Sequence, residues 1–276
     1  MTKFAAVLAL AAAVGVPSRA HTASAQATVP FVRDGEELVF NVRSSRFGDI
    51  GTATMKVVMD TAEGRPAYRL SFDFSARVML FKVSDRTRSW VDTRTLTTLR
   101  YSKTERSPVA KRNEDAHMNL AANSWTDATG THALASQVPL DELAFIYFVR
   151  MIAGEVQAGS PMVVKRHFDA GRNPVLLESK GTVRVRALGD SLSARVIQMD
   201  AQDTRSKKGK TRITFYIGDD AARLPLRMDT SMPVAGTLTM TLRSVSMHGR
   251  VVAGGVGGQR TEGRANQDDK SAGDRQ

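Results

Sequence analysis

Apolar and polar residues alternate with a period of two along most of this chain. In an extended strand this period places all the apolar side chains on one face and the polar side chains on the other. The pattern therefore predicts a mainly β protein, built as an antiparallel meander of strands with one apolar face. The alternating runs are Leu38-Phe40-Val42, Ala53-Met55-Val57-Met59, Tyr68-Leu70-Phe72-Phe74, Val183-Val185-Ala187, Ile213-Phe215-Ile217 and Leu238-Met240-Leu242.

Turn-forming residues separate these runs at regular intervals. They are Asp49 to Gly51, Glu63 to Pro66, Gly189-Asp190, Lys208-Gly209 and Pro233 to Gly236. Short connections of this kind join neighbouring antiparallel strands. Because a sheet must bury its apolar face against something, we expect the meander to close into a barrel or to form a strongly curved sheet.

One segment departs from the period of two. Residues 141–154 read DELAFIYFVRMIAG, with apolar side chains at helical spacing. Asp141 can cap the first turn and Gly154 can end the last. The segment predicts a single amphipathic helix, at about residues 141–153, that packs against the sheet as a plug.

The N-terminus carries the pattern of a secretory signal peptide. Lys3 is followed by an apolar run from Phe4 to Val16, and Ala23-Ser24-Ala25 has the small-residue form of a cleavage site. We therefore expect residues 1–25 to be removed and the protein to be periplasmic. Residues 26–248 then form a single β-rich domain. Residues 249–276, which are rich in Gly, Gln, Asp and Arg, are expected to be a disordered tail.

Composition narrows the choice of partners. The chain has no cysteine, so it has neither disulfides nor a lipid-anchored cysteine, and its formal net charge is +11. A basic protein of this kind suits a peripheral contact with an anionic membrane, and a soluble protein that its charge keeps dispersed is the alternative. The densest basic run, from Arg205 to Arg212, has few aromatic residues nearby, which argues against nucleic acid as a partner. No segment after the signal is apolar enough to span a bilayer as a helix, and charged outward positions on the strands disfavour an outer-membrane barrel. The protein is thus expected to be soluble and not transmembrane.

Several short patterns follow one another in a fixed order between Phe31 and Arg243. They are Phe31 to Phe40 (FVRDGEELVF), Gly51-Thr52-Ala53, Phe81-Lys82-Val83 with Asp85, Trp90-Val91-Asp92 with Leu96, Asp141 with Tyr147, Arg150 and Gly159, Asp219-Asp220, and Arg223-Leu224-Pro225-Leu226. In this order they resemble the family of exported bacterial proteins catalogued as domain of unknown function 3108. That family often has Trp before the Asp-Asp pair, where this chain has Phe215-Tyr216-Ile217-Gly218. The resemblance implies an exported, β-rich single domain and transfers no catalytic residue.

Chemical motifs are absent from the sequence. The five histidines have no metal-ligand spacing, and there is neither a nucleophile elbow nor a phosphate-binding loop, so we predict no catalytic residue, no metal and no cofactor. The aromatic residues Phe72, Phe74, Trp90 and Tyr147 are candidates to line an apolar cavity, with Arg150 of the predicted helix as a further candidate; filling of the core is the alternative. The sequence favours non-catalytic binding of an apolar or amphipathic small molecule or of a cell-envelope protein. A cell-envelope hydrolase, with a site assembled from scattered residues, is the alternative function.

Overall fold

The computed structural model describes residues 29–107, 111–202, 209–232 and 235–254. The predicted signal peptide and residues 255–276 of the predicted tail lie outside these ranges. So do Arg205, Lys207 and Lys208 of the basic run, whereas Lys210 and Arg212 are exposed at the start of a strand.

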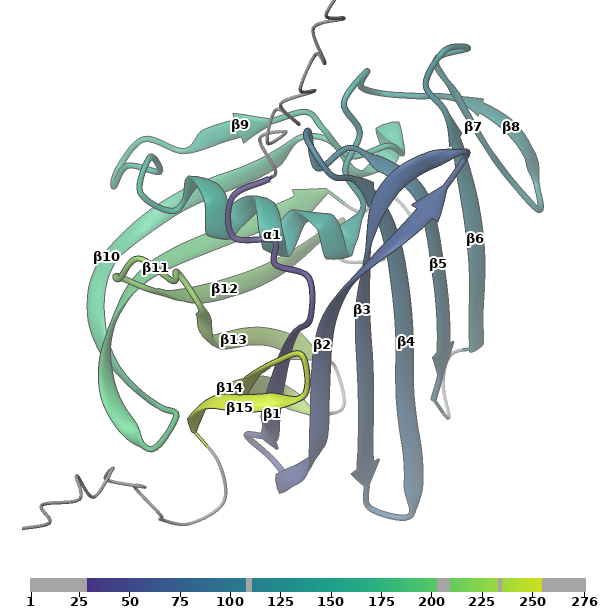
Figure 1. Ribbon diagram of the computed structural model, residues 1–276. Helices are drawn as coiled ribbons and strands as arrows, with labels where there is room; N and C mark the ends of the chain where they lie inside the picture. Colours follow the sequence, from purple (N-terminus) through teal and green to yellow (C-terminus); the bar gives the residue numbers. More distant parts are fainter. Residues whose placement is uncertain (1–28, 108–110, 203–208, 233–234, 255–276) are drawn as a thin grey trace, which may run out of the picture.

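The described residues form fifteen strands and one α-helix (Figure 1). In chain order these are β1 (Glu36–Ser44), β2 (Gly48–Ala62), β3 (Arg65–Val78), β4 (Phe81–Asp92), β5 (Thr98–Arg106), β6 (Lys111–Asn119), β7 (Ser124–Asp127), β8 (Gly130–Ala133), α1 (Glu142–Ile152), β9 (Met162–Val164), the 3-10 turn η1 (Ala170–Arg172), β10 (Val175–Ala187), β11 (Asp190–Gln202), β12 (Lys210–Gly218), β13 (Pro225–Met232), β14 (Gly236–Met247) and β15 (Arg250–Gly254).

All the strands belong to one antiparallel sheet. Its order is β8-β7-β6-β5-β4-β3-β2-β1-β14-β13-β12-β11-β10-β9, with β15 paired to β14. The chain therefore builds two meanders, and β1 joins them by pairing with β2 on one side and β14 on the other. In the described residues β8 and β9 stand at the two ends of this path and do not pair with each other.

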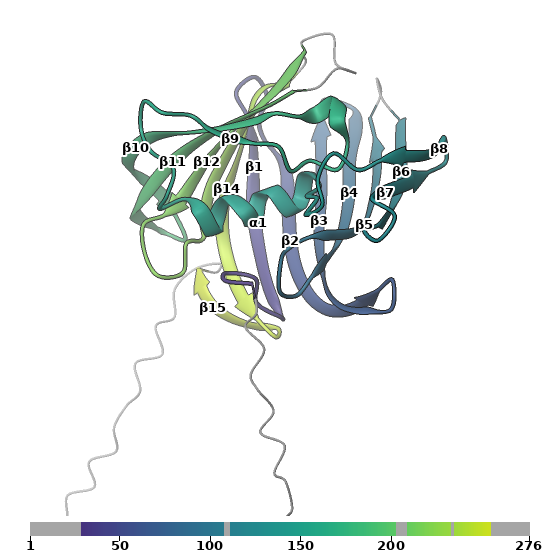
Figure 2. The same cartoon turned by 90° about the horizontal axis from the view of Figure 1, so that it is seen from above.

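The sheet is strongly curved, and α1 runs across its concave side (Figure 2). The predicted mainly β architecture with one packed helix is thus confirmed, in the form of an open curved sheet. The curvature brings both meanders onto one core, in which Phe40 and Leu70 of the first half, Phe215 of the second and Phe145 of α1 belong to the same buried cluster. A sheet with one apolar face is stable in this form because the helix and the opposite half of the sheet cover that face.

Helix α1 begins and ends where its sequence indicates. Asp141 is its N-cap, and the Oδ1 atom accepts from the backbone N–H groups of Leu143 (2.8 Å) and Ala144 (2.9 Å). These two donors have no partner inside the helix, and the cap satisfies them. Most of the helix surface is buried, which agrees with its position across the concave side of the curved sheet.

Two local predictions were wrong. The first turn lies at residues 45–47, and Asp49 to Gly51 belong to β2, because Arg43 and Ser44 still pair with Asp49 and Gly48. The predicted tail also contains regular structure, because Arg250–Gly254 form β15. Composition did not indicate this strand because it is held by backbone pairing to β14, with Ala253 packed on the core. Within the described residues, no helix has the length and apolarity needed to cross a membrane.

Candidate functional site

A cavity of about 250 Å³ lies on the concave side of the sheet, next to the first turns of α1. Its walls come from both meanders, so its two sides are far apart in the sequence. The lining residues are Phe72 and Phe74 (β3), Val83, Ser84, Asp85 and Thr87 (β4), Lys103 and Glu105 (β5), Glu142, Leu143 and Ile146 (α1), Ile213 and Phe215 (β12), Met228, Thr230 and Met232 (β13), and Leu238 and Met240 (β14).

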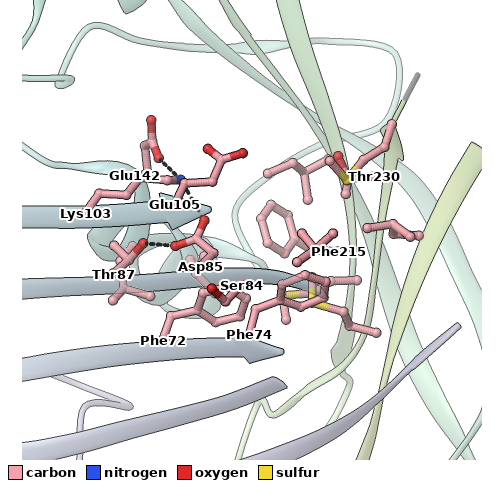
Figure 3. Close-up of a pocket in the computed structure, with 18 residues that line it drawn as sticks. Phe72, Phe74, Ser84, Asp85, Thr87, Lys103, Glu105, Glu142, Phe215 and Thr230 are labelled. Atoms are coloured by element: carbon pink, nitrogen blue, oxygen red, sulfur yellow. Dashed lines mark hydrogen bonds and ion pairs between the residues drawn. The ribbon is translucent and has the colours of Figure 1, made fainter. Parts of the chain in front are cut away.

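Most of this lining is apolar. Figure 3 shows Phe72 and Phe74 from one side of the cavity and Phe215 from the other. The period of two explains the wall, since Phe72 and Phe74, like Ile213 and Phe215, are separated by one residue that points to the outer face. The β13 and β14 residues add three methionines, whose flexible thioethers adapt to ligands of different shape.

One edge of the cavity is charged. The Nζ atom of Lys103 lies 3.0 Å from Oδ2 of Asp85 and 3.1 Å from Oε2 of Glu142. The Thr87 hydroxyl donates to Asp85 Oδ1 at 2.7 Å. We call Asp85, Lys103 and Glu142 the polar edge. Their side chains are mostly shielded from solvent, with exposed fractions of 19%, 13% and 29%, so the three groups are held in place by each other (Figure 3).

Glu142 connects the polar edge to a neighbouring group of buried side chains. Its Oε2 accepts from the Tyr101 hydroxyl at 3.1 Å, and its Oε1 pairs with Arg172. Burial raises the pKa of Tyr101 well above its usual value, and the charge of Asp141 adds to this effect. Tyr101 therefore stays protonated at neutral pH and remains a hydrogen-bond donor to Glu142.

The position of α1 over the cavity depends on Asp141. Besides capping the helix, its Oδ2 accepts from the hydroxyls of Ser89 on β4 and Thr98 on β5, the latter at 2.8 Å. The Thr98 hydroxyl in turn accepts from the backbone N–H of Asp141 at 2.9 Å. One fully buried carboxyl thus joins the start of the helix to two strands, and this contact places Glu142, Leu143 and Ile146 against the cavity.

The structure separates the five residues predicted to bind a ligand. Phe72 and Phe74 line the cavity. Trp90 lies on the other face of β4 from Asp85 and Thr87; its indole N–H donates to Asp60 Oδ2 at 3.1 Å, and Arg100 stacks on its ring. Alternation along β4 accounts for this, because residues at odd and even positions point to opposite faces.

Tyr147 and Arg150 lie farther along α1, outside the cavity lining. Arg150 is 1% exposed and makes a two-bond ion pair with Glu36 of β1, at 2.7 and 3.2 Å. Its Nε also donates to the Arg223 carbonyl at 3.1 Å, and its guanidinium lies over the Tyr147 ring. These contacts join the end of the helix to the sheet, so Arg150 has a structural role.

The polar edge was not among the residues predicted to bind a ligand. A signal for two of its members was present, because Asp85 and Lys103 have the same phase along their strands as the buried residues Thr87 and Tyr101. A charged residue at an inward position of an amphipathic strand marks a functional or paired group. What the phase does not reveal is that Glu142 of a distant helix lies beside them.

The polar groups of the described lining are hydroxyls, carboxylates and one ammonium group. Among the described residues, no group of His, Cys, Asp and Glu is arranged to hold a metal ion. The described lining contains the hydroxyls of Ser84, Thr87 and Thr230 but no histidine, so it holds no hydroxyl–imidazole pair that could act as nucleophile and base. What the arrangement can do is to surround an apolar group and present hydrogen-bonding groups at one end.

Comparison with known proteins gives a family and a fold. Residues 39–243 match the family model described as "Protein of unknown function (DUF3108)". The fold is similar to that of a crystal structure described as a beta-barrel-like protein of domain of unknown function DUF1849 from Brucella abortus, with a TM-score of 0.53 and 11% sequence identity over 78% of this chain and 99% of that chain. No curated protein is significantly similar in sequence.

Proposed function

Since this chain belongs to the DUF3108 family of proteins of unknown function, we propose its role from its own cavity: it is a non-catalytic protein that binds one apolar or amphipathic small molecule. The observation that carries the proposal is the contrast within the lining. An apolar wall from β3, α1 and β12 to β14 faces a single polar edge on β4, β5 and α1. Ligand sites commonly combine an apolar enclosure with a few fixed polar groups that orient the ligand.

The contrast also indicates how the ligand lies. Its apolar part contacts Phe72, Phe74 and Phe215, and its polar end lies near Lys103 and Asp85. Because Lys103 already pairs with two carboxylates, the edge has no excess positive charge to attract an anion. A ligand with a neutral, hydrogen-bonding polar end therefore suits the cavity better than a free carboxylate.

The proposal is tested with a cavity-filling variant. Thr230→Trp places an indole in the cavity, and the neutral dye N-phenylnaphthylamine, which fluoresces in apolar surroundings, is the probe. We expect the wild-type protein to bind the dye and the variant to bind it about tenfold more weakly or worse, since the indole takes up the space the dye needs. Fluorescence titration measures both affinities.

A matched variant serves as the control. Thr237 lies on β14 next to the lining residue Leu238 and is exposed on the other face, so Thr237→Trp adds the same side chain outside the cavity and should bind the dye as the wild type does. Equal affinities for all three proteins, or no binding by the wild type, would contradict a ligand site in this cavity. Native mass spectrometry of protein from the periplasm then identifies what co-purifies.

The proposed location is the periplasm. It is supported by the charged start, the apolar run from Phe4 to Val16 and the Ala23-Ser24-Ala25 motif. We expect the expressed protein to appear in the periplasmic fraction with a mass that corresponds to cleavage after Ala25. Intact mass measurement after osmotic release is the check, and an uncleaved protein in the cytoplasmic fraction would exclude this location.

A further inference from the structure

The turn between β3 and β4 is the most exposed apolar segment among the described residues. Met79, Leu80 and Phe81 are 70%, 94% and 55% exposed. They follow one another in the chain, so they form a single apolar point at the end of a long hairpin, which extends away from α1 in Figure 1. We call these three residues the apolar tip. Exposed apolar groups clustered in this way mark contacts with a membrane or a partner.

The local backbone shows that turn formation does not account for these residues. Val78 pairs with Phe81, so Met79 and Leu80 are the two central residues of a tight hairpin turn. Met79 has φ of 55°, in the left-handed region that Gly or Asn adopts at lower cost. A methionine there, followed by an almost fully exposed leucine, is unfavourable for the isolated domain.

The strand registers place other turns on the same side of the molecule. Ser44 at the end of β1 pairs with Gly48 and Leu238, Gly51 pairs with Ala76, and Ser84 pairs with Arg106. The β1–β2 and β3–β4 turns, together with the end of β5, the start of β6, the end of β13 and the start of β14, therefore lie along one edge of the curved sheet, which we call the rim. Phe47 and Met232 add exposed apolar side chains to the rim.

The charges on the rim are mainly positive. The acidic residues described in these turns and their flanks are Asp49, which pairs with Arg43, and Glu105. An apolar point surrounded by basic side chains matches an anionic bilayer, since the apolar groups enter the interface and the cations meet the lipid headgroups. The basic residues are Arg43, Arg46, Arg77, Lys82, Arg106 and Lys111.

We propose that the rim is a membrane-docking surface, and that the apolar tip inserts into the interface of a bilayer that contains anionic phospholipid. Val83, the second residue after Phe81 on β4, lines the cavity, and so does Met232 on the rim. Docking in this orientation brings the cavity close to the lipid. The proposal goes beyond ligand binding and does not depend on it.

Vesicle flotation tests the docking surface. The probes are vesicles of phosphatidylcholine alone and of an equimolar mixture with phosphatidylglycerol. We expect the protein to float with the mixed vesicles. The triple variant Met79→Ser, Leu80→Ser, Phe81→Ser should have a partition coefficient lower by about tenfold or more, because it lacks the apolar side chains that enter the bilayer. Arg77→Glu with Lys82→Glu should remove the preference for the anionic vesicles.

The chain offers a matched control at the other end of the sheet. Val251 and Val252 on β15 are 63% and 60% exposed, and β15 lies beside the β14 segment that pairs with the start of β1. Val251→Ser with Val252→Ser should float like the wild type. A wild-type protein that does not float, or a triple variant that floats as well as the wild type, would overturn the proposal.

A fluorescent label reports insertion directly. Because the chain has no cysteine, Leu80→Cys and Val252→Cys each create a unique site for an environment-sensitive dye. The dye at position 80 should shift to the blue on mixed vesicles, and the dye at position 252 should not. The Thr230→Trp variant separates the two proposals, since it should bind N-phenylnaphthylamine weakly in the cavity and should still float with the mixed vesicles.

Discussion

Replacement of Arg150 by methionine is expected to lower the free energy of unfolding by about 3–5 kcal/mol. The guanidinium and the Glu36 carboxylate are 1% and 3% exposed, and they make two hydrogen bonds with each other. Methionine keeps the apolar stem but leaves the Glu36 carboxylate buried without its cation. The carbonyls of Arg223 and Ala222 also lose a donor. Urea unfolding followed by circular dichroism measures the change.

A double variant separates the ion pair from simple loss of packing. Glu36→Leu with Arg150→Met removes both charges, and we expect it to be clearly more stable than either single variant, because no buried charge is left without a partner. Arg223→Met is a control on the neighbouring loop that leaves the Glu36–Arg150 pair intact. If the decrease in the free energy of unfolding of the double variant equals the sum of the decreases in the two single variants, the two side chains are not coupled in the way that their distances indicate.

Replacement of Asp141 by alanine is expected to cost about 2–4 kcal/mol of stability. The change removes the helix cap, and it leaves the hydroxyls of Ser89 and Thr98 without their acceptor in a fully buried place. Since these contacts hold the start of α1 over the cavity, the variant should also bind N-phenylnaphthylamine more weakly. Asp127→Ala is the control: Asp127 is the last residue of β7, its side chain is 27% exposed, and its Oδ1 accepts from the backbone N–H of Thr129, so its loss should cost less stability.

The conservative variant Asp141→Asn adds a test by pH. Burial raises the pKa of the Asp141 carboxyl above its ordinary value of 3.8, and the hydrogen bonds from Ser89, Ala144, Thr98 and Leu143 offset only part of that effect. The folded state therefore holds this proton more tightly than the unfolded chain. The stability that the protonated group contributes is complete below pH 3.8 and is lost as the pH rises through the raised pKa.

Asparagine does not titrate, so the comparison isolates this one group. The stability of Asp141→Asn relative to the wild type should increase as the pH rises from about 4 towards neutrality. Denaturant unfolding of both proteins at several pH values gives the difference. A difference that falls with pH would mean that the hydrogen bonds outweigh burial and that the carboxylate is the preferred form.

The local pattern of the sequence was sufficient to predict the strands and the helix. Leu38, Phe40 and Val42 repeat with a period of two, and each is buried in β1. Asp141 ahead of an apolar run predicted the start of α1, and the run ends within the predicted range. These signals suffice because strand faces and helix caps depend on residues within a few positions of each other.

Only one wall of the cavity could be predicted from the sequence. Phe72 and Phe74 were predicted to line it, but Phe215, Met228 and Leu238 on the opposite wall come from strands more than a hundred residues later in the chain. Trp90 and Arg150 were equally plausible from their residue types. One points to the outer face of β4, and the other meets a carboxylate 114 positions away.

The sequence alone identifies a mainly β chain with one capped helix. It also shows that the chain is basic, that it lacks cysteine, and that its motifs occur in the order typical of one family. Those properties follow from period, composition and short motifs, which are local. The tertiary structure was needed to show that the sheet stays open, that Asp85, Lys103 and Glu142 meet at one edge, and that an apolar tip and basic side chains share one rim. Each of these depends on contacts or exposure that the folded chain sets, such as the contact of Glu142 on α1 with Lys103 on β5, and local residue spacing does not give them.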